Sequence, residues 1–182
     1  MRRDAQQRRE ALIQAAASCF GESGYTVALE DIADRAGVGR GTLYRNFRDR
    51  MALILAIFER EVDRLDLSID PDLPLAQTIA RLVRRGAPAS FLFARLASDM
   101  PLQGDNMVAF RALGVRLEQL VAPAVALARA RGEIRAGIGG RELVMAMRMA
   151  NGVLHPGMAD AEIDEAIEGA VALLMVGLRA DD

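Results

Sequence analysis

The stretch that decides the fold reads Leu29-Glu-Asp-Ile-Ala-Asp-Arg-Ala-Gly-Val-Gly-Arg-Gly-Thr-Leu-Tyr-Arg-Asn-Phe47. Gly37 follows residues 29–36, whose pattern is that of a short helix. A glycine directly after the last helical turn can adopt a positive φ. The pattern predicts a short helix over 29–36, a glycine-containing turn, and a second short helix over 39–47. Two short helices joined by a turn of three to four residues form a helix-turn-helix.

Apolar and polar residues of this stretch separate onto two sides. The apolar residues can share one small core: Ile32, Ala36, Val38, Leu43 and Phe47. The remaining residues of the second helix form a polar face: Arg40, Thr42, Tyr44, Arg45 and Asn46. Arginine offers forked donors to guanine edges, and hydroxyl and amide groups donate to phosphates. This face is therefore the candidate DNA-binding surface.

The residues after the second short helix predict the start of another helix. Asp49 is suited to cap a long helix that begins at Arg50 and extends to about residue 67. The charge of Arg50 and the free N–H groups at a helix start both favour a phosphate. The sequence therefore predicts that Arg50 contacts the DNA backbone.

The composition of the 182 residues favours an all-α protein. Hydrophobic residues make up 52% of the chain, aromatic residues make up 4%, and Trp is absent. Ala and Leu are strong helix formers, whereas a strand-rich protein would contain more Thr, Tyr and Trp. We predict about nine helices and no strand. Their expected ranges are 4–22, 29–36, 39–47, 50–67, 75–85, 89–100, 106–130, 141–154 and 161–179.

Charge is distributed unevenly along the chain. The net charge is −2 at pH 7, and all 23 basic residues are Arg. Residues 1–50 contain nine Arg and seven Asp or Glu, a net charge of +2, whereas residues 51–182 contain 14 and 18, a net charge of −4. A basic patch on an acidic body indicates a confined anionic partner.

The segment Ala36-Gly-Val-Gly-Arg-Gly-Thr-Leu-Tyr-Arg-Asn-Phe47, with Arg50 three positions on, resembles the TetR/AcrR-type bacterial transcriptional regulators. Arg2-Arg-Asp-Ala-Gln6 and Gly24-Tyr25 are similar to the same family, so the resemblance covers roughly residues 1–55. It implies a homodimer that binds a double-stranded, pseudo-palindromic operator. Such a protein is usually a repressor that a small ligand releases. We therefore expect a helix-turn-helix DNA-binding domain over 1–48 and an effector-binding and dimerisation domain over 49–182.

The resemblance also implies roles for individual residues. Arg40 and Gly41 fall where such proteins approach base edges, and Arg50 falls where a phosphate-binding Lys is usual. Contacts to the DNA backbone and thymine methyl groups are implied for Thr42, Tyr44 and Asn46. There are two departures from the family pattern. Ala28 stands where a Ser or Thr usually caps the first short helix, and Met51 stands where Glu is usual.

Apolar residues after residue 50 suggest two further sites. The candidate ligand pocket consists of Phe58, Val62, Phe91, Met100, Met107 and Phe110. Because this set is apolar, the expected effector is a small hydrophobic molecule. The last two predicted helices are expected to form the dimer interface through Leu143, Met147, Leu154, Ile167, Val171, Leu174 and Leu178.

The remaining features favour a cytoplasmic protein without a cofactor or a metal site. Cys19 is the single cysteine and lies on the apolar stripe of the first helix, and His155 is the single histidine. One cysteine and one histidine cannot form the usual zinc or di-iron sites, and no catalytic triad motif is present. We expect no enzymatic activity and no membrane contact. The alternative hypotheses are a helical small-molecule-binding protein with vestigial DNA binding and a helical-bundle enzyme.

Overall fold

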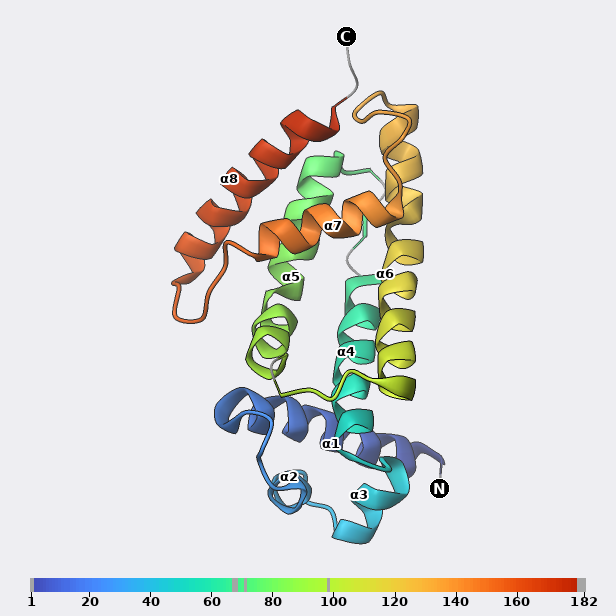
Figure 1. The fold of residues 1–182 in the computed structure, drawn as a ribbon, viewed down its shortest axis with the longest axis vertical. Coiled ribbons are helices and arrows are strands. Elements are labelled where there is room, and N and C mark those ends of the chain that lie inside the picture. Colours follow the sequence, from blue (N-terminus) through green and yellow to red (C-terminus); the bar gives the residue numbers. More distant parts are fainter. Residues whose placement is uncertain (1, 67–68, 71, 98, 180–182) are drawn as a thin grey trace. The chain divides into compact units, whose positions relative to one another are not determined.

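In the computed structural model of the protein, the described residues are 2–66, 69–70, 72–97 and 99–179. Within them every regular element is an α-helix, which confirms the all-α prediction (Figure 1). Over these described residues there are eight helices, where the sequence predicts about nine.

Contacts within the chain divide it into two units. Unit 1 consists of Met1–Glu61 and Leu92–Arg111, and unit 2 consists of Val62–Phe91 and Ala112–Asp182. These two units are groups of residues that pack together. The predicted functional division after residue 48 stays a prediction.

The first three helices of unit 1 pack against one another (Figure 1). They are α1 (Arg2–Ser23), α2 (Leu29–Arg35) and α3 (Arg40–Asn46). The α1 residues that recur at helical spacing are buried: Leu12, Ile13, Ala16, Cys19 and Phe20. Burial of Ile32 from α2 and Leu43 from α3 completes this small core.

The turn between α2 and α3 has the predicted geometry. Gly37 has a φ of 67° directly after the end of α2. The N–H of Val38 donates to the carbonyl oxygen of Ala33 at 3.0 Å, which satisfies a carbonyl at the helix end. Gly39 is the N-cap residue of α3. The helix-turn-helix therefore lies where the sequence predicts it.

Helix α4 (Arg50–Asp66) begins with the predicted cap. The N–H of Ala52 donates to the Asp49 carboxylate at 2.7 Å. Met51 is buried, so this position suits an apolar side chain rather than the Glu that the resemblance implies. Residue 67, the predicted end of this helix, lies outside the described residues.

The predicted break at 86–88 is wrong. Helix α5 (Leu75–Leu96) is continuous and has Pro88 inside it. Buried residues lie on both sides of Pro88 in this helix: Val83 and Ala87 before it, and Leu92 and Leu96 after it. This packing compensates for the backbone N–H that a proline lacks. Two predicted helices are therefore one.

Unit 2 has its own core. Besides parts of α5 and of α6 (Gly104–Ala130), it contains α7 (Gly140–Asn151) and α8 (Asp160–Leu178), which pack against each other (Figure 1). Its most deeply buried side chains include Ile79, Leu82, Val83, Val121, Leu143 and Ile167. On the surface, the Arg84 guanidinium joins α5 to α8 through Asp160 at 2.9 Å and Asp164 at 3.0 Å.

Helix α7 begins in close contact with α6. A Cβ atom added to Gly140 would lie 2.5 Å from the backbone carbonyl oxygen of Glu118. At the same helix start, the N–H of Gly139 donates to the Glu142 carboxylate at 2.8 Å. This hydrogen bond lowers the pKa of Glu142 below its ordinary value.

We expect Gly140→Ala to destabilise the protein by about 1–3 kcal/mol, because the added methyl group meets backbone that cannot rotate away. Thermal unfolding followed by circular dichroism measures this change. Gly86→Ala is the matched control, since a Cβ there has no atom within 4 Å. An alanine inside a helix should raise stability by about 0.5–1 kcal/mol at such a position. Equal effects of both substitutions would contradict the close contact.

Candidate nucleic-acid interface

The exposed side of α3 displays the residues predicted to bind DNA. Leu43 is buried in the core of unit 1, so the residues on the opposite side of the same turns face solvent. Exposed residues are Arg40, Gly41, Tyr44 and Arg45, and half-buried residues are Thr42 and Asn46. The structure therefore brings all six onto one short helix.

Two hydrogen bonds order this face. The Arg45 guanidinium donates to the Thr42 hydroxyl at 3.1 Å. The Asn46 side-chain amide donates to the backbone carbonyl of Thr42 at 2.7 Å. Both side chains are thus held along the helix, which reduces the rotamer freedom that binding would otherwise remove.

Arg40 forms an ion pair with Glu30 in the first turn of α2. The Arg40 side chain is 68% exposed and that of Glu30 is 37% exposed. Exposed ion pairs contribute little to stability in water. Arg40 can therefore exchange this partner for a base edge at small cost.

Arg50 is turned toward its own chain. Its guanidinium donates to the backbone carbonyl oxygens of Tyr25 at 2.6 Å and Val27 at 2.5 Å. The phosphate contact predicted for Arg50 stays a prediction, and the structure adds an internal role for the same side chain.

Other arginines near α3 also have partners within unit 1. Arg35 forms a two-point ion pair with the Glu22 carboxylate at 2.8 and 2.9 Å, which lowers the pKa of Glu22. Arg9 lies over the Phe47 ring at 5.1 Å.

Cys19 is buried, as the sequence predicts, and burial raises the pKa of its thiol. The thiol is therefore protonated and unreactive at neutral pH.

The residues of the predicted ligand pocket are divided between the two units. In unit 1, Phe58 meets the edge of Phe93 at 5.9 Å between ring centroids, and Phe93 stacks on Phe110 at 5.4 Å. Met100 is buried and Met107 is half-buried in the same unit.

Val62 and Phe91 belong to unit 2, where Phe91 packs against the core. Sequence reasoning chose Phe91 and omitted Phe93 from the pocket. Residues two apart in a helix point to different sides, and periodicity did not show which side contains the aromatic cluster.

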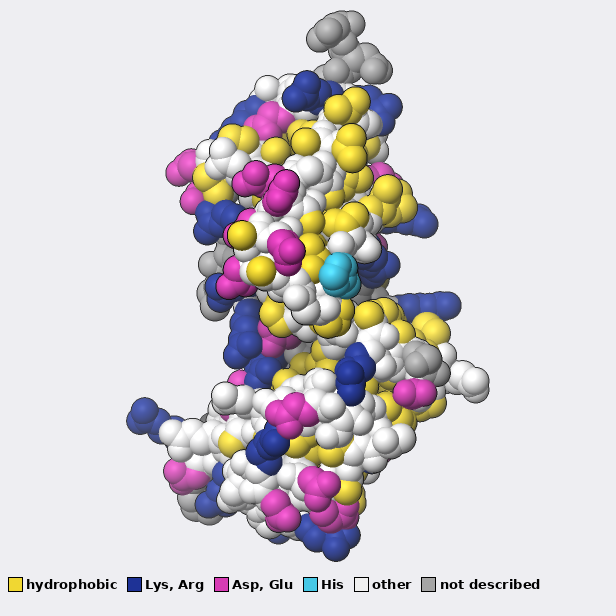
Figure 2. All heavy atoms as spheres, turned by 90° about the vertical axis from the view of Figure 1, so that its left-hand side faces the viewer, with side chains coloured by type: hydrophobic (Ala, Val, Ile, Leu, Met, Phe, Trp, Pro, Cys, Tyr) yellow, Lys and Arg dark blue, Asp and Glu magenta, His cyan; other side chains and the backbone are white. Residues whose placement is uncertain are grey.

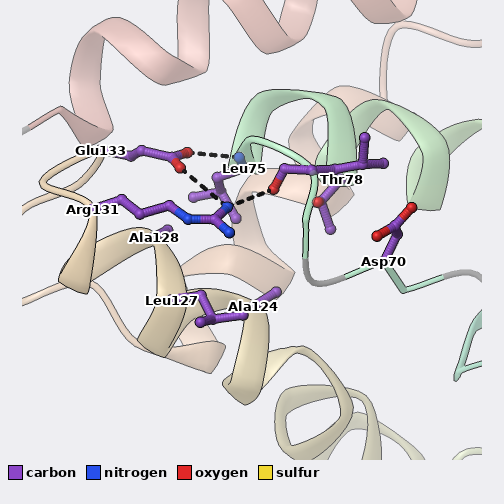
Figure 3. A pocket seen from close by; sticks show the side chains of 9 residues that line it. Asp70, Leu75, Thr78, Ala124, Leu127, Ala128, Arg131 and Glu133 are labelled. Atoms are coloured by element: carbon purple, nitrogen blue, oxygen red, sulfur yellow. Dashed lines mark hydrogen bonds and ion pairs between the residues drawn. The ribbon is translucent and has the colours of Figure 1, made fainter.

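A small cavity lies in unit 2, and none of the predicted pocket residues lines it (Figure 3). Its lining residues are Asp70, Leu73, Leu75, Thr78, Ala124, Leu127, Ala128, Arg131 and Glu133. The Glu133 carboxylate accepts the N–H of Leu75 at 2.7 Å, and Arg131 donates to the Leu73 carbonyl at 3.1 Å. Its polar groups thus cap the start of α5 and already satisfy one another.

Five of the predicted dimer residues lie in the core of their own unit. These are Leu143, Met147, Leu154, Ile167 and Val171. Leu174 and Leu178 are half-buried against the same core. Large apolar side chains that do face solvent on α7, on α8 and between them are Met145, Met149, Val153, Leu173 and Val176.

Figure 2 shows hydrophobic side chains gathered on the unit 2 surface near the histidine, His155, which lies between α7 and α8. Across the described residues, no helix is long and apolar enough to span a membrane. Nor does any described group of three His, Cys, Asp or Glu side chains form a metal-binding cluster.

Comparisons with known proteins agree with this geometry. Residues 12–57, which include α2 and α3, match the family described as "Bacterial regulatory proteins, tetR family". The chain is 35% identical over 88 residues to the HTH-type transcriptional activator FasR of Mycolicibacterium smegmatis. That match covers 48% of this chain and only 40% of FasR.

Solved structures match along nearly the whole chain. GusR of Salmonella enterica has the same fold, with a TM-score of 0.71 at 17% identity over 94% of this chain and 95% of that one. A TetR transcriptional regulator from Streptomyces coelicolor is 30% identical, covers 96% of this chain and 99% of its own, and has a TM-score of 0.60. With the helix-turn-helix in place and a relative matched over its full length, this chain belongs to the TetR family.

Proposed function

We propose that the protein is a sequence-specific DNA-binding regulator of transcription that acts as a homodimer. The exposed polar face of α3 is the observation that supports this proposal. It places forked and hydroxyl donors on a rigid helix, as reading the major groove requires.

Repression is the proposed direction of control, because it is usual in the family. FasR is named an activator, so a reporter gene behind the bound operator is the test of direction.

Arg40 is the proposed base-reading residue, because the first residues of the second helix reach base edges in this motif. We expect Arg40→Ala to weaken binding by about 1–3 kcal/mol and to relax the preference at one base position. Binding to a library of operator variants measures both effects. Arg48→Ala is the control, since Arg48 is also exposed but lies beyond α3, paired with Asp49 at 3.0 Å. An unchanged base preference in Arg40→Ala would disprove base reading.

The proposed dimer interface is the solvent-facing apolar side of α7 and α8. One short helix reads only a half-site, so useful specificity requires a two-fold dimer. Met145 and Met149 are four residues apart on α7, and Leu173 and Val176 are three apart on α8. Each set forms one stripe, and stripes of exposed apolar surface mark protein–protein contacts. The buried residues of the sequence prediction instead support the fold of one protomer.

We expect Leu173→Glu to give a folded monomer that has lost operator binding. Leu173 is 78% exposed, so a charge there should leave the core intact and oppose a second copy. Light scattering at micromolar concentration measures the mass. Val108→Glu is the control, because Val108 is also apolar and is 68% exposed but lies on α6. A dimeric Leu173→Glu protein would exclude this interface. Leu174→Glu would test the fold instead, because Leu174 packs on the core.

The proposed effector is a small hydrophobic ligand that binds at the aromatic cluster of Phe58, Phe93 and Phe110. An apolar lining favours an apolar ligand, because a buried charge without a partner is costly. By linkage, a ligand that lowers operator affinity by some factor is itself bound more weakly by the same factor when operator is present.

We expect Phe110→Ala to reduce release of DNA by ligand while leaving ligand-free operator affinity unchanged. The substitution removes the ring that stacks on Phe93 and does not touch α3. Compounds that raise the melting temperature of the wild-type protein are tested, with both proteins, for release of operator DNA by fluorescence anisotropy. A compound that binds tightly and leaves operator affinity unchanged at saturation would contradict the release mechanism.

A further inference from the structure

Arg50 connects three segments of unit 1. Its Nη1 atom donates to the carbonyl oxygens of Tyr25 and Val27, at 2.6 and 2.5 Å. Its guanidinium carbon lies 5.3 Å from the centre of the Tyr25 ring and 5.9 Å from that of Phe20. Nη1 has two hydrogens, and the two carbonyls use both. The first residue of α4 is thus attached to α1 and to the connection between α1 and α2.

The connection that Arg50 holds leads directly into an uncapped helix. Ala28 is the N-cap residue of α2, with φ −65° and ψ 137°, and it makes no side-chain hydrogen bond to the helix. Ser, Thr, Asp or Asn at such a position would accept an N–H from the first turn. Helix α2 has only seven residues, so an unfixed first turn affects about half of it.

We propose that Arg50 takes the place of this missing cap. By holding the carbonyls of Tyr25 and Val27, it fixes where the chain enters α2 and so orients α2 and α3. Arg50 is then a positioning residue for DNA binding. This inference rests on the proposed DNA-binding function, and it assigns Arg50 a role different from the predicted phosphate contact.

The chemistry of the guanidinium explains why arginine suits this role. It is flat, so it can lie against the rings of Phe20 and Tyr25 while its N–H groups donate in its own plane. A lysine ammonium has the same charge but is compact and strongly hydrated. Arg50→Lys therefore separates the two roles, because it preserves charge near a phosphate and removes the planar contact.

The first experiment measures DNA binding by the full-length protein. The probe is a duplex that the wild-type protein selects from a random-sequence pool, titrated at several salt concentrations. We expect Arg50→Lys to weaken binding about tenfold with an unchanged salt slope. Adding Ala28→Ser to Arg50→Lys should restore most of the loss, because the serine hydroxyl caps α2. In the wild-type background Ala28→Ser should change affinity less than threefold.

A phosphate contact gives the opposite results. Arg50→Lys would then bind nearly as the wild type does, and Arg50→Gln would reduce the salt slope by about one unit. Ala28→Ser would restore nothing, since a cap on α2 cannot replace a charge on α4. This set of results would overturn the proposal.

The second experiment does not depend on DNA. Amide hydrogen exchange over residues 25–32 should become faster in Arg50→Lys, and Ala28→Ser should restore protection in the first turn of α2. Arg48→Lys is the matched control, since Arg48 is exposed and pairs only with its neighbour Asp49 among the contacts described for it. If the wild type selects no duplex, the proposed DNA-binding function fails, and exchange alone decides the role of Arg50. Unchanged exchange in Arg50→Lys would disprove that role.

Discussion

Helices of seven residues are not stable by themselves in water, because nucleation costs more than so few hydrogen bonds return. Helices α2 and α3 both have this length. Their stability depends on burying Ile32 and Leu43 against the apolar face of α1, where Phe20 is completely buried. The orientation of the proposed DNA-binding face depends on this small core, because burial of Leu43 determines which side of α3 faces solvent.

Turn geometry and polar contacts fix the backbone around this core. Gly37 allows the chain to reverse between the two short helices, and Asp49 caps the helix that follows them. Arg50 holds the connection that enters α2, whose N-cap residue Ala28 offers no side-chain acceptor. These contacts are made by few residues and mostly to backbone atoms. The backbone of the helix-turn-helix is thereby fixed, while the outer side chains stay available to a partner.

In unit 2, apolar residues of α7 and α8 lie both in the core and on the solvent-exposed surface. Helix α8 has apolar residues around most of its circumference, so one side fills the core and another side faces solvent. Ile167 and Val171 belong to the first side, and Leu173 and Val176 to the second. Helix α7 is divided in the same way between Met147, which is buried, and Met145 and Met149, which are exposed. One copy of unit 2 therefore fills its own core and also exposes apolar side chains on α7 and α8.

The amino-acid sequence was enough to predict the all-α class, the helix-turn-helix over 29–47, the cap at Asp49 and the family. These features are encoded within a few consecutive residues, through spacing, glycine placement and side-chain type. Features that depend on packing between distant segments were decided only by the tertiary structure. Helix α5 continues through Pro88 with buried residues on both sides of it. Helix α8 offers no sequence signal for which apolar side faces the core. The two carbonyls held by Arg50 lie 25 and 23 residues before it in the chain, and no local pattern relates them. Periodicity describes one helix at a time, whereas burial depends on what lies beside it.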